Sequence, residues 1–509
     1  MVAKFFIPNY QGKLHWITHQ LSSYRIAEKV VMSENIDCEK NMNENEIFNR
    51  LLTVLESYRA SGKDGKVLEY HSPNELAKIL DLHGPEKNGD WETIFDWVEK
   101  YLTYSVKTSH PAFLNRMWVG ANLPSVVGEI VAAVTNTSAC TFESAPVSTL
   151  VEKYMIEQML DLVGFVQGEG QMTTGSSNAN MVAMMSARNM SNSKVKTEGL
   201  CGQKKLYAFV GADSHYSMDK AVNILGIGTS QLVKVDLNTN GEMIPEMLRK
   251  SIEKVIAEGG EPFFVAATAG TTVRGAYDPI EPLVELRKEF GFWLHVDGAW
   301  GGAAVLSPVL KEKYLRGLEE ADSFTCDFHK MLGASLMCNI LLINKSVHTL
   351  GSALSAGDGS YLFRDEGINE VEDFGTVSLQ CGRRVDSLKW FLDWKFFGRE
   401  GLAKRIEGYL ALCEYAESLV VSSAELEMIA PRTSFNICFR YHVAEKDANS
   451  FNIALRTALY KEGLSLVGVA YIEGKAVMRL LITNPDATKA DVDNFFARVK
   501  AVGSRLMQQ

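Results

Sequence analysis

From residue 205 to residue 344 the chain repeats one pattern, in which a short apolar run is followed by a polar segment long enough to form a helix. The runs are LYAFVGA (206–212), QLVKVDL (231–237), FFVAATAG (263–270), FWLHVDG (292–298), SFTCD (323–327) and NILLIN (339–344). They show little alternation of apolar and polar residues, which is typical of strands buried on both faces of a parallel sheet. Helices between the strands would cover both faces. The pattern therefore predicts an α/β domain.

The segments on either side of this pattern predict two further parts. Residues 1–110 are mostly polar with helical periodicity, as in NEIFNRLLTVLESYRA, and predict an N-terminal helical arm. Residues 111–398 would then form the large domain. From residue 399 a helix, GLAKRIEGYLALCEYAESLV, precedes the strand candidates SFNICFRY and AVMRLLIT, so residues 399–509 are predicted to form a small α+β domain.

Charge and cysteine usage exclude several classes of partner. The net charge of -10 argues against nucleic acid or an anionic membrane surface, because both require a basic face. We find no apolar run long enough to span a membrane and no signal peptide at the N-terminus, so we expect a cytoplasmic protein. The eight cysteines are scattered without the pairing typical of metal sites, which favours reduced thiols and no bound metal.

Two charged residues follow buried strands at the edge of the sheet where ligands collect. Asp297 lies at the end of FWLHVDG, and Lys330 follows shortly after SFTCD. Burying either charge without a partner is costly. One interpretation is a salt bridge between the two. The other is a site for pyridoxal phosphate (PLP), which needs a lysine for its Schiff base and a carboxylate to keep its ring nitrogen protonated.

Other residues could complete a PLP site. The Gly-Ser-Ser turn at residues 175–177 opens a predicted helix, where backbone amides and the positive end of the helix dipole could bind a phosphate. The alternative is an ordinary helix start with serine as the N-cap. Ala299 and its glycine neighbours would let a flat ring lie close to the backbone. His215 follows a strand and could be a structural hydrogen-bonding residue or a ring stacked on the cofactor.

Six ordered motifs make the chain resemble the group II PLP-dependent amino acid decarboxylases. They are HVDGAWGG, DFHKMLG, ATAGTTVRGAYDPI, SHYSMDKA, HPAFLNRM and LQCGRRVDSLKWFLDWKFFG. The similarity covers roughly residues 70 to 505 and is greatest to the branch of glutamate, cysteine sulfinate and aspartate decarboxylases. It implies the type I, aminotransferase-like fold and a homodimer with active sites at the subunit interface. It also implies conversion of an acidic L-amino acid to its amine and CO₂.

The resemblance also implies roles for individual residues. Lys330 would hold PLP, Asp297 would meet the ring nitrogen, and the ring would lie between His215 and Ala299. The remaining cofactor contacts would be Gly175, Ser176 and Ser177 at the phosphate, with His329 and Thr268. Tyr361 lies in residues 352–367, which resemble the family's mobile catalytic loop, and would return a proton to the substrate α-carbon. Without the resemblance, Tyr361 would be interpreted as a packed aromatic residue.

Arg479 and Arg116 are the candidates for substrate recognition. Arg479 lies inside an apolar strand, where a guanidinium requires an anion, either a structural carboxylate or the substrate α-carboxylate that the family implies. Arg116 occurs in HPAFLNRM, where relatives typically have glutamine, and would grip the acid group of the substrate side chain. The alternative is that Arg116 pairs with Glu129 or Glu143 and faces away from the site.

Ser138 and Cys140 are further candidates for substrate specificity. Ser138 matches the cysteine sulfinate branch, and Cys140 replaces a large aromatic residue of relatives. Arg383 also lies in a family motif, and we interpret it as structural. Alternative functions are an aminotransferase, an aldehyde-forming oxidative decarboxylase or a non-catalytic scaffold. Tyr361 argues against the aldehyde-forming type, where the family often carries phenylalanine.

Overall fold

The computed structural model describes residues 42–84, 89–344, 348–355, 359, 361–363 and 373–508. They divide into two compact units. The first comprises the described parts of residues 1–61 and 71–105, and the second comprises residues 62–70 and the described chain from residue 106. Within the described residues, no helix is long and apolar enough to cross a membrane.

The first unit contains three helices, α2 (Glu44–Ala60), α3 (Pro73–Leu80) and α4 (Trp91–Tyr104). Each helix begins at a residue whose side chain accepts a backbone N–H of the first turn, namely Asn43, Ser72 and Asp90. Such caps satisfy donors that a helix start would otherwise leave unpaired.

The second unit is built on a large sheet. In spatial order its strands are β2 (Glu169–Thr173), β8 (Asn339–Ile343), β7 (Ser323–Asp327), β6 (Trp293–Gly298), β5 (Glu261–Thr268), β3 (Leu206–Gly211) and β4 (Leu232–Val235). The strands from β7 to β4 run parallel, so the predicted parallel sheet is confirmed there.

The run at residues 339–344 forms β8, but it lies antiparallel to β7. Only residues 328–338 connect these strands, and a parallel return needs a crossover of a dozen or more residues. This short connection carries Lys330 and places it just beyond the carboxyl end of β7. Strand β2 also lies antiparallel, at the edge beside β8. Its sequence, EGQMT, lacks an apolar run, and we did not predict a strand there.

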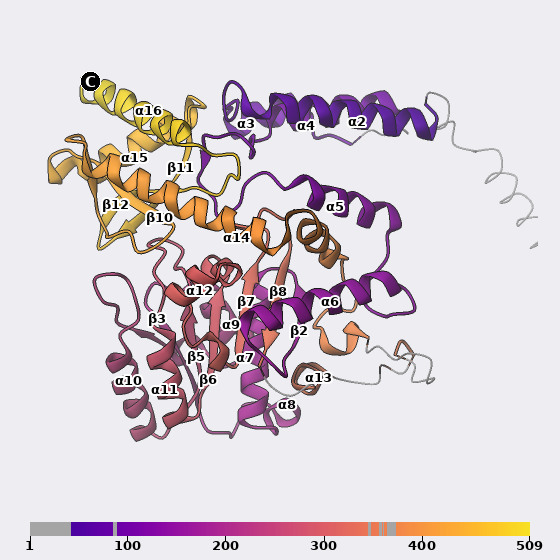
Figure 1. The fold of residues 1–509 in the computed structure, drawn as a ribbon, viewed down its shortest axis with the longest axis vertical. Helices are drawn as coiled ribbons and strands as arrows, with labels where there is room; N and C mark the ends of the chain where they lie inside the picture. The colour runs from indigo at the N-terminus through magenta and orange to yellow at the C-terminus, as the bar shows by residue number, and fades with distance from the viewer. Residues whose placement is uncertain are drawn as a thin grey trace, which may run out of the picture. The chain divides into compact units, whose positions relative to one another are not determined.

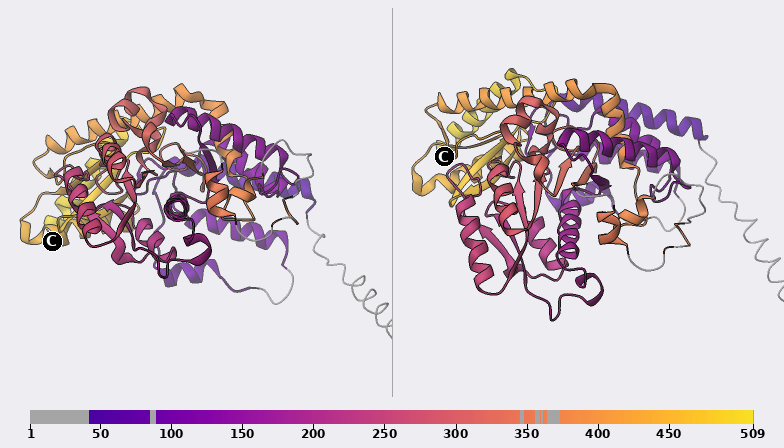
Figure 2. Two further views of the ribbon diagram at one scale, coloured as in Figure 1. Left: turned by 90° about the horizontal axis from the view of Figure 1, so that it is seen from below. Right: turned by 60° about the horizontal axis from the view of Figure 1, so that its bottom comes forward.

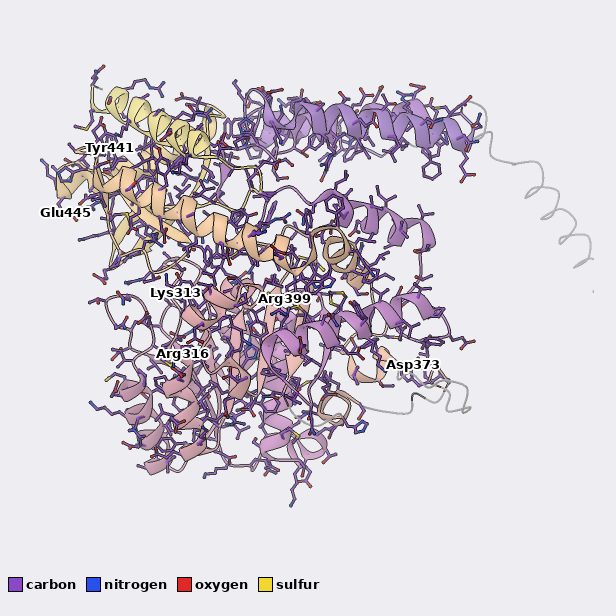
Figure 3. The ribbon with its side chains drawn as sticks, viewed as in Figure 1. Lys313, Arg316, Asp373, Arg399, Tyr441 and Glu445 are labelled. Carbon is purple, nitrogen blue, oxygen red and sulfur yellow. The ribbon has the colours of Figure 1, made fainter. Side chains whose placement is uncertain are left out.

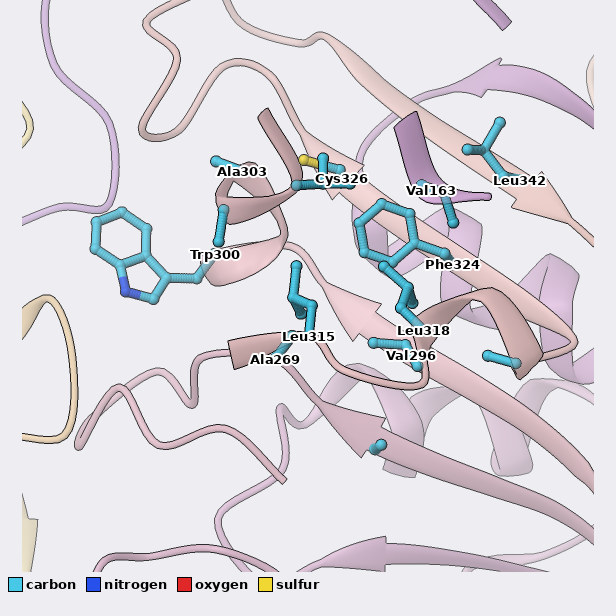
Figure 4. Close-up of a cluster of buried hydrophobic side chains, with 14 of the residues drawn as sticks. Val163, Ala269, Val296, Trp300, Ala303, Leu315, Leu318, Phe324, Cys326 and Leu342 are labelled. Carbon is cyan, nitrogen blue, oxygen red and sulfur yellow. The ribbon is translucent and has the colours of Figure 1, made fainter. Parts of the chain in front are cut away.

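Helices pack on both faces of the large sheet (Figure 1). The helices of this part of the chain are α5 (Leu123–Thr135), α6 (Pro146–Val163), α7 (Ser176–Ser191), α8 (Val195–Glu198), α9 (Ser217–Ile224), α10 (Pro245–Ala257), α11 (Ile280–Phe290), α12 (Pro308–Tyr314) and α13 (Thr349–Leu354). Among them, α6, α7, α9, α10 and α11 pack directly on the large sheet. Alternate residues of β5 enter different cores, with Val265 and Ala267 in one and Phe264 and Ala266 in the other. Figure 4 shows part of the first core, where Val296 and Phe324 lie beside Leu318, which follows α12.

A smaller sheet contains β1 (Phe113–Leu114), β11 (Leu466–Ile472), β12 (Lys475–Leu481), β10 (Asn436–Tyr441) and β9 (Leu426–Met428), in that order. Its helices are α14 (Asp386–Val421), α15 (Glu445–Lys461) and α16 (Lys489–Met507), and α14 is interrupted at Gly398. Figure 2 shows α14, in orange, beside the yellow strands of this sheet. Strand β1 pairs with β11, which brings the segment around residue 115 to the small sheet.

Candidate active site

A cavity of about 290 Å³ lies at the carboxyl ends of the parallel strands. Its lining includes every predicted cofactor residue, namely Gly175, Ser176, Ser177, His215, Thr268, Asp297, Ala299, His329 and Lys330. These residues come from five separate stretches of the chain, and the parallel strand order brings them to one edge.

Asp297 is buried on one wall of this cavity and is held by a chain of hydrogen bonds. Asn180 Nδ2 donates to Asp297 Oδ2 at 2.8 Å, and His295 Nε2 lies 2.9 Å from Asn180 Oδ1. Burial lowers the pKa of His295 to about 4, so the ring is neutral and carries one N–H. Trp293 Nε1 donates to Ser323 Oγ at 2.7 Å, and Ser323 Oγ lies 2.8 Å from His295 Nδ1. A proton on His295 Nε2 makes every bond in this chain point toward the Asp297 carboxylate.

Lys330 meets a different carboxylate. Its Nζ lies 2.9 Å from Asp327 Oδ2, so its ion pair in the structure is with Asp327 and the direct Lys330–Asp297 salt bridge is not formed. Asp327 Oδ1 accepts hydrogen bonds from Ser176 N at 3.2 Å, Ser176 Oγ at 3.0 Å and Asn339 Nδ2 at 2.7 Å. Burial acts to raise the pKa of Asp327, but Lys330, His329 and Ser176 together hold it below its ordinary value. Asp327 is therefore an anion at neutral pH.

The turn at residues 175–177 has the geometry of an anion site. Gly175 is the N-cap of α7 with φ 105°, a left-handed backbone conformation that favours glycine because other residues adopt it only with strain. No side chain caps this helix, so the alternative of an ordinary serine N-cap is wrong. Ser176 and Ser177 begin the helix and line the cavity, where the positive end of the helix dipole favours a negative charge.

His215 lies half-buried at the cavity. Its Nδ1 is 2.9 Å from Ser217 Oγ, and its ring centre is 4.2 Å from that of Tyr216. Burial lowers the pKa of His215, while the nearby Asp297 acts to raise it. A neutral, half-buried ring at this position is suited to stacking on a flat ligand.

Arg479 lies beside this cavity in β12 without a carboxylate partner among the described residues. It donates to Thr272 O at 2.7 Å and to Asn115 O at 2.8 Å, and Thr272 lines the cavity. Burial lowers the pKa of Arg479, and the positive charge of Arg116 lowers it further. The guanidinium thus lacks the structural anion that one interpretation of the sequence required.

Arg116 is exposed and lines a second cavity, of about 360 Å³, with Asn115, Arg456 and Tyr471 among its neighbours. The next two residues, Met117 and Trp118, line the first cavity. Glu129 is bound by Arg384 and by Lys389, so the suggested pairing of Arg116 with Glu129 is wrong.

Ser138, Cys140 and Tyr361 do not line the Lys330 cavity. Ser138 Oγ accepts from Arg383 N at 3.1 Å, and Cys140 O accepts from Gly375 N at 2.8 Å. Asp373, labelled in Figure 3, holds the same stretch by accepting from Phe142 N at 2.7 Å. Tyr361 is 77% exposed. Its neighbours 356–358, 360 and 364–372, which include the predicted loop residues Gly357 and Asp358, lie outside the described residues.

The residues of the first cavity fit PLP. An amine, a buried carboxylate, an anion-binding turn and a neutral imidazole surround one space, and these are the groups needed to bond the aldehyde, the ring nitrogen, the phosphate and the ring face. The sequence reasoning missed Asn180, His295 and Asp327 in this site. Asp327 and His295 stood inside the apolar runs SFTCD and FWLHVDG, where a buried polar residue signals a required partner.

Comparisons with known proteins agree with this geometry. The family model of the pyridoxal-dependent decarboxylase conserved domain matches residues 73–442. The acidic amino acid decarboxylase of Bos taurus is 33% identical over 467 residues, covering 89% of this chain and 89% of the relative. The cysteine sulfinic acid decarboxylase of Mus musculus is 34% identical and covers 87% of this chain and 92% of the relative. The crystal structure of mouse CSAD superposes with a TM-score of 0.86 and 31% identity, over 90% of this chain and 98% of that chain.

Proposed function

This chain belongs to the pyridoxal-dependent decarboxylase family, and from that premise we propose that it decarboxylates an acidic L-amino acid to the corresponding amine. The membership confirms the predicted enzyme class and PLP as the cofactor, and the likeness to mouse CSAD confirms the type I fold. The observation that carries the substrate class is the cluster of positive charge beside the Lys330 cavity, where the charge of Arg116 interacts with those of Arg479 and Arg456.

The chain's own groups have separable tasks in this proposal. Lys330 would bond the cofactor, Asp297 would hold the proton of the ring nitrogen, and the turn at residues 175–177 would bind the phosphate. His215 and Ala299 would hold the ring. When bound, PLP supplies the electron sink for the electron pair released as CO₂ leaves.

Substrate recognition is assigned to the arginines. Arg479 would hold the α-carboxylate, and it is near enough to Arg116 for their charges to interact. Arg456 is near Arg116 as well, so three guanidinium groups create a positive field that favours a second acid group on the substrate. We assign Arg116 to that side-chain acid group, with aspartate, glutamate and cysteine sulfinate as the candidate substrates.

We further propose a homodimer in which Tyr361, Ser138 and Cys140 serve the site of the partner subunit. Support comes from exposed apolar residues on two helices, neither of which contributes a residue to the lining of the Lys330 cavity. They are Leu123, Val127, Ile130, Val131 and Val134 on α5, and Val147, Leu150 and Tyr154 on α6. Apolar faces of this kind are typical of subunit interfaces. The cytoplasm is the proposed compartment, in keeping with the free thiols of the described cysteines.

Two experiments test these assignments. Borohydride reduction of the holoenzyme followed by peptide mapping should place a pyridoxyl label on Lys330, and a label elsewhere would exclude the cofactor assignment. A panel of acidic, aromatic and basic amino acids should then give CO₂ and amine from the acidic members alone. Release of a keto acid, or equal turnover of aromatic substrates, would contradict the proposed reaction or substrate class.

A further inference from the structure

Asp327 occupies an unusual place in the cavity, because it binds the groups that the cofactor phosphate also requires. Its Oδ1 accepts both the N–H and the hydroxyl of Ser176, at 3.2 and 3.0 Å. Its Oδ2 lies 2.9 Å from Lys330 Nζ. The carboxylate is 3% exposed, so water screens its charge weakly.

The proposed phosphate position and Asp327 therefore share the donors of one residue. A phosphate that takes the Ser176 N–H and hydroxyl must lie next to the carboxylate that already accepts them. Like charges a few ångströms apart repel strongly where water is excluded, because little solvent lies between them to screen the interaction. In the cofactor-free protein Lys330, His329 and Ser176 hold the pKa of Asp327 below its ordinary value, so the carboxylate is charged when a phosphate approaches.

The other contacts of Asp327 explain why its carboxylate stays in place. Asn339 Nδ2 donates to it at 2.7 Å, and Asn339 is itself fixed by donation to Cys326 O at 2.9 Å. His329 Nε2 lies 3.8 Å away. Asn339 is the first residue of β8 and pairs with Asp327 at the last position of β7, so the sheet itself aligns the two side chains.

We propose that Asp327 is an affinity-setting residue, which shares Ser176 with the cofactor phosphate and by its negative charge weakens the hold on PLP. This inference rests on the proposed binding of the phosphate at residues 175–177. The enzyme would then exchange its cofactor readily, because the negative charge of Asp327 repels the negative charge of the cofactor phosphate.

The test compares wild-type holoenzyme with Asp327→Asn, which removes the charge and keeps the shape and an acceptor oxygen. Each holoenzyme is diluted and incubated, and samples taken over time are passed through gel filtration to separate the protein from released PLP. The fluorescence of the released PLP then gives the rate of cofactor loss. We expect Asp327→Asn to lose cofactor about tenfold more slowly, which corresponds to about 1.4 kcal/mol. Unchanged or faster loss from a variant with a wild-type melting curve would overturn the inference.

Asp322→Asn is the matched control, since Asp322 flanks the other end of β7 and is bound by Arg287 outside the cavity. Its rate of cofactor loss should equal that of the wild type. If Asp327→Asn does not fold, Asp327→Ser removes the same charge and is judged by the same criterion.

A competition experiment separates the phosphate from the bond to Lys330. Pyridoxine 5′-phosphate and pyridoxine, which cannot form an imine, are used to displace PLP from each holoenzyme. Asp327→Asn should bind pyridoxine 5′-phosphate more tightly, with the affinity for pyridoxine unchanged. An equal gain in affinity for both ligands would contradict a phosphate-specific effect.

Borohydride labelling of wild-type Lys330 distinguishes this inference from the proposed function. If Lys330 is not labelled, the proposed cofactor arrangement fails. If Lys330 is labelled and Asp327→Asn loses cofactor at the wild-type rate, this inference alone is refuted.

Discussion

Asn180 and Asp297 lie 117 positions apart in the chain, and the Asn180 amide donates to the Asp297 carboxylate at 2.8 Å. Asn180 lies in the second turn of α7, whose first turn carries Ser176 and Ser177, the serines proposed to bind the phosphate. The same helix thus carries the proposed phosphate site and orients Asp297, the proposed partner of the ring nitrogen. One rigid element would therefore position both groups that are proposed to hold the two ends of the cofactor.

Replacing Asn180 by alanine should therefore reduce catalysis without abolishing the fold. A hydrogen bond to a charged group contributes about 1.5–3 kcal/mol, so we expect kcat/KM to fall by about tenfold to a hundredfold. The pH dependence of the cofactor's absorbance should shift in Asn180→Ala, because Asp297 would hold the ring proton less well. Asn189→Ala is the control, since Asn189 is a buried residue of the same helix that donates to Ala353 O at 3.0 Å. Equal effects in both variants would mean that α7 is merely destabilised.

Arg479→Lys should impair substrate binding, because lysine keeps the charge but loses the forked geometry that matches a carboxylate. We expect kcat/KM to fall by about a hundredfold with each accepted substrate, with no change in the order of preference. Steady-state kinetics on the acidic panel would measure this. Arg440→Lys, on neighbouring β10, is the control, because Arg440 binds Glu427 and Glu445 away from the cavity. A change in substrate preference in Arg479→Lys would assign that residue to the side-chain acid group.

Arg116→Gln should change the preference among substrates. If Arg116 binds the side-chain acid group, its loss should lower kcat/KM for aspartate, glutamate and cysteine sulfinate unequally, by about tenfold or more for the preferred one. Lys107→Gln is a suitable control, because that lysine lies nearby in sequence and donates to Asp64 O at 3.1 Å. Unchanged ratios of kcat/KM would remove Arg116 from substrate recognition.

The parts of the fold that could be predicted are the strands that are buried along their whole length, because their sequences are continuous apolar runs. A strand covered on both faces must be apolar, and the six runs between residues 205 and 344 are strands. Edge strand β2 escaped prediction because pairing with β8, and not an apolar pattern, defines it. Lys330 and Asp297 could be predicted because Asp297 lies at the end of one apolar run and Lys330 follows shortly after another. The partnerships of Asp327 with Ser176 and of Asn180 with Asp297 join residues more than a hundred positions apart, and the packing of α7 on the sheet determines them.

A mixed dimer tests whether Tyr361 acts across the subunit interface. Lys330→Ala and Tyr361→Phe should each form little amine alone. When the two variants are coexpressed, a heterodimer has one site with an intact lysine from one subunit and an intact tyrosine from the other. Amine formation should recover to about a quarter of the wild-type value, since about half of the dimers are mixed and each has one complete site. No recovery, with heterodimers present, would show that Tyr361 serves its own subunit.

Asp393 predicts a pH dependence of stability that is independent of catalysis. It lies buried in α14 and accepts from Asn122 Nδ2 at 2.8 Å and Ser125 N at 3.1 Å, which ties α14 to the start of α5. Burial raises the pKa of Asp393 to about 7, against the lowering effect of Asn122. Between its unfolded pKa, about 4, and pH 7 the folded state holds a proton that the unfolded state has released, so stability falls as pH rises through this window.

Asp393→Asn removes this titrating group, so the stability of the variant relative to the wild type should increase as pH rises. We expect the difference in unfolding free energy between the variant and the wild type to increase by about 3 kcal/mol from pH 4 to pH 8. Melting curves of both proteins at several pH values would measure it, because groups common to both cancel in the comparison. Parallel pH profiles would mean that Asp393 stays ionised in the folded protein, with Arg405 compensating its charge.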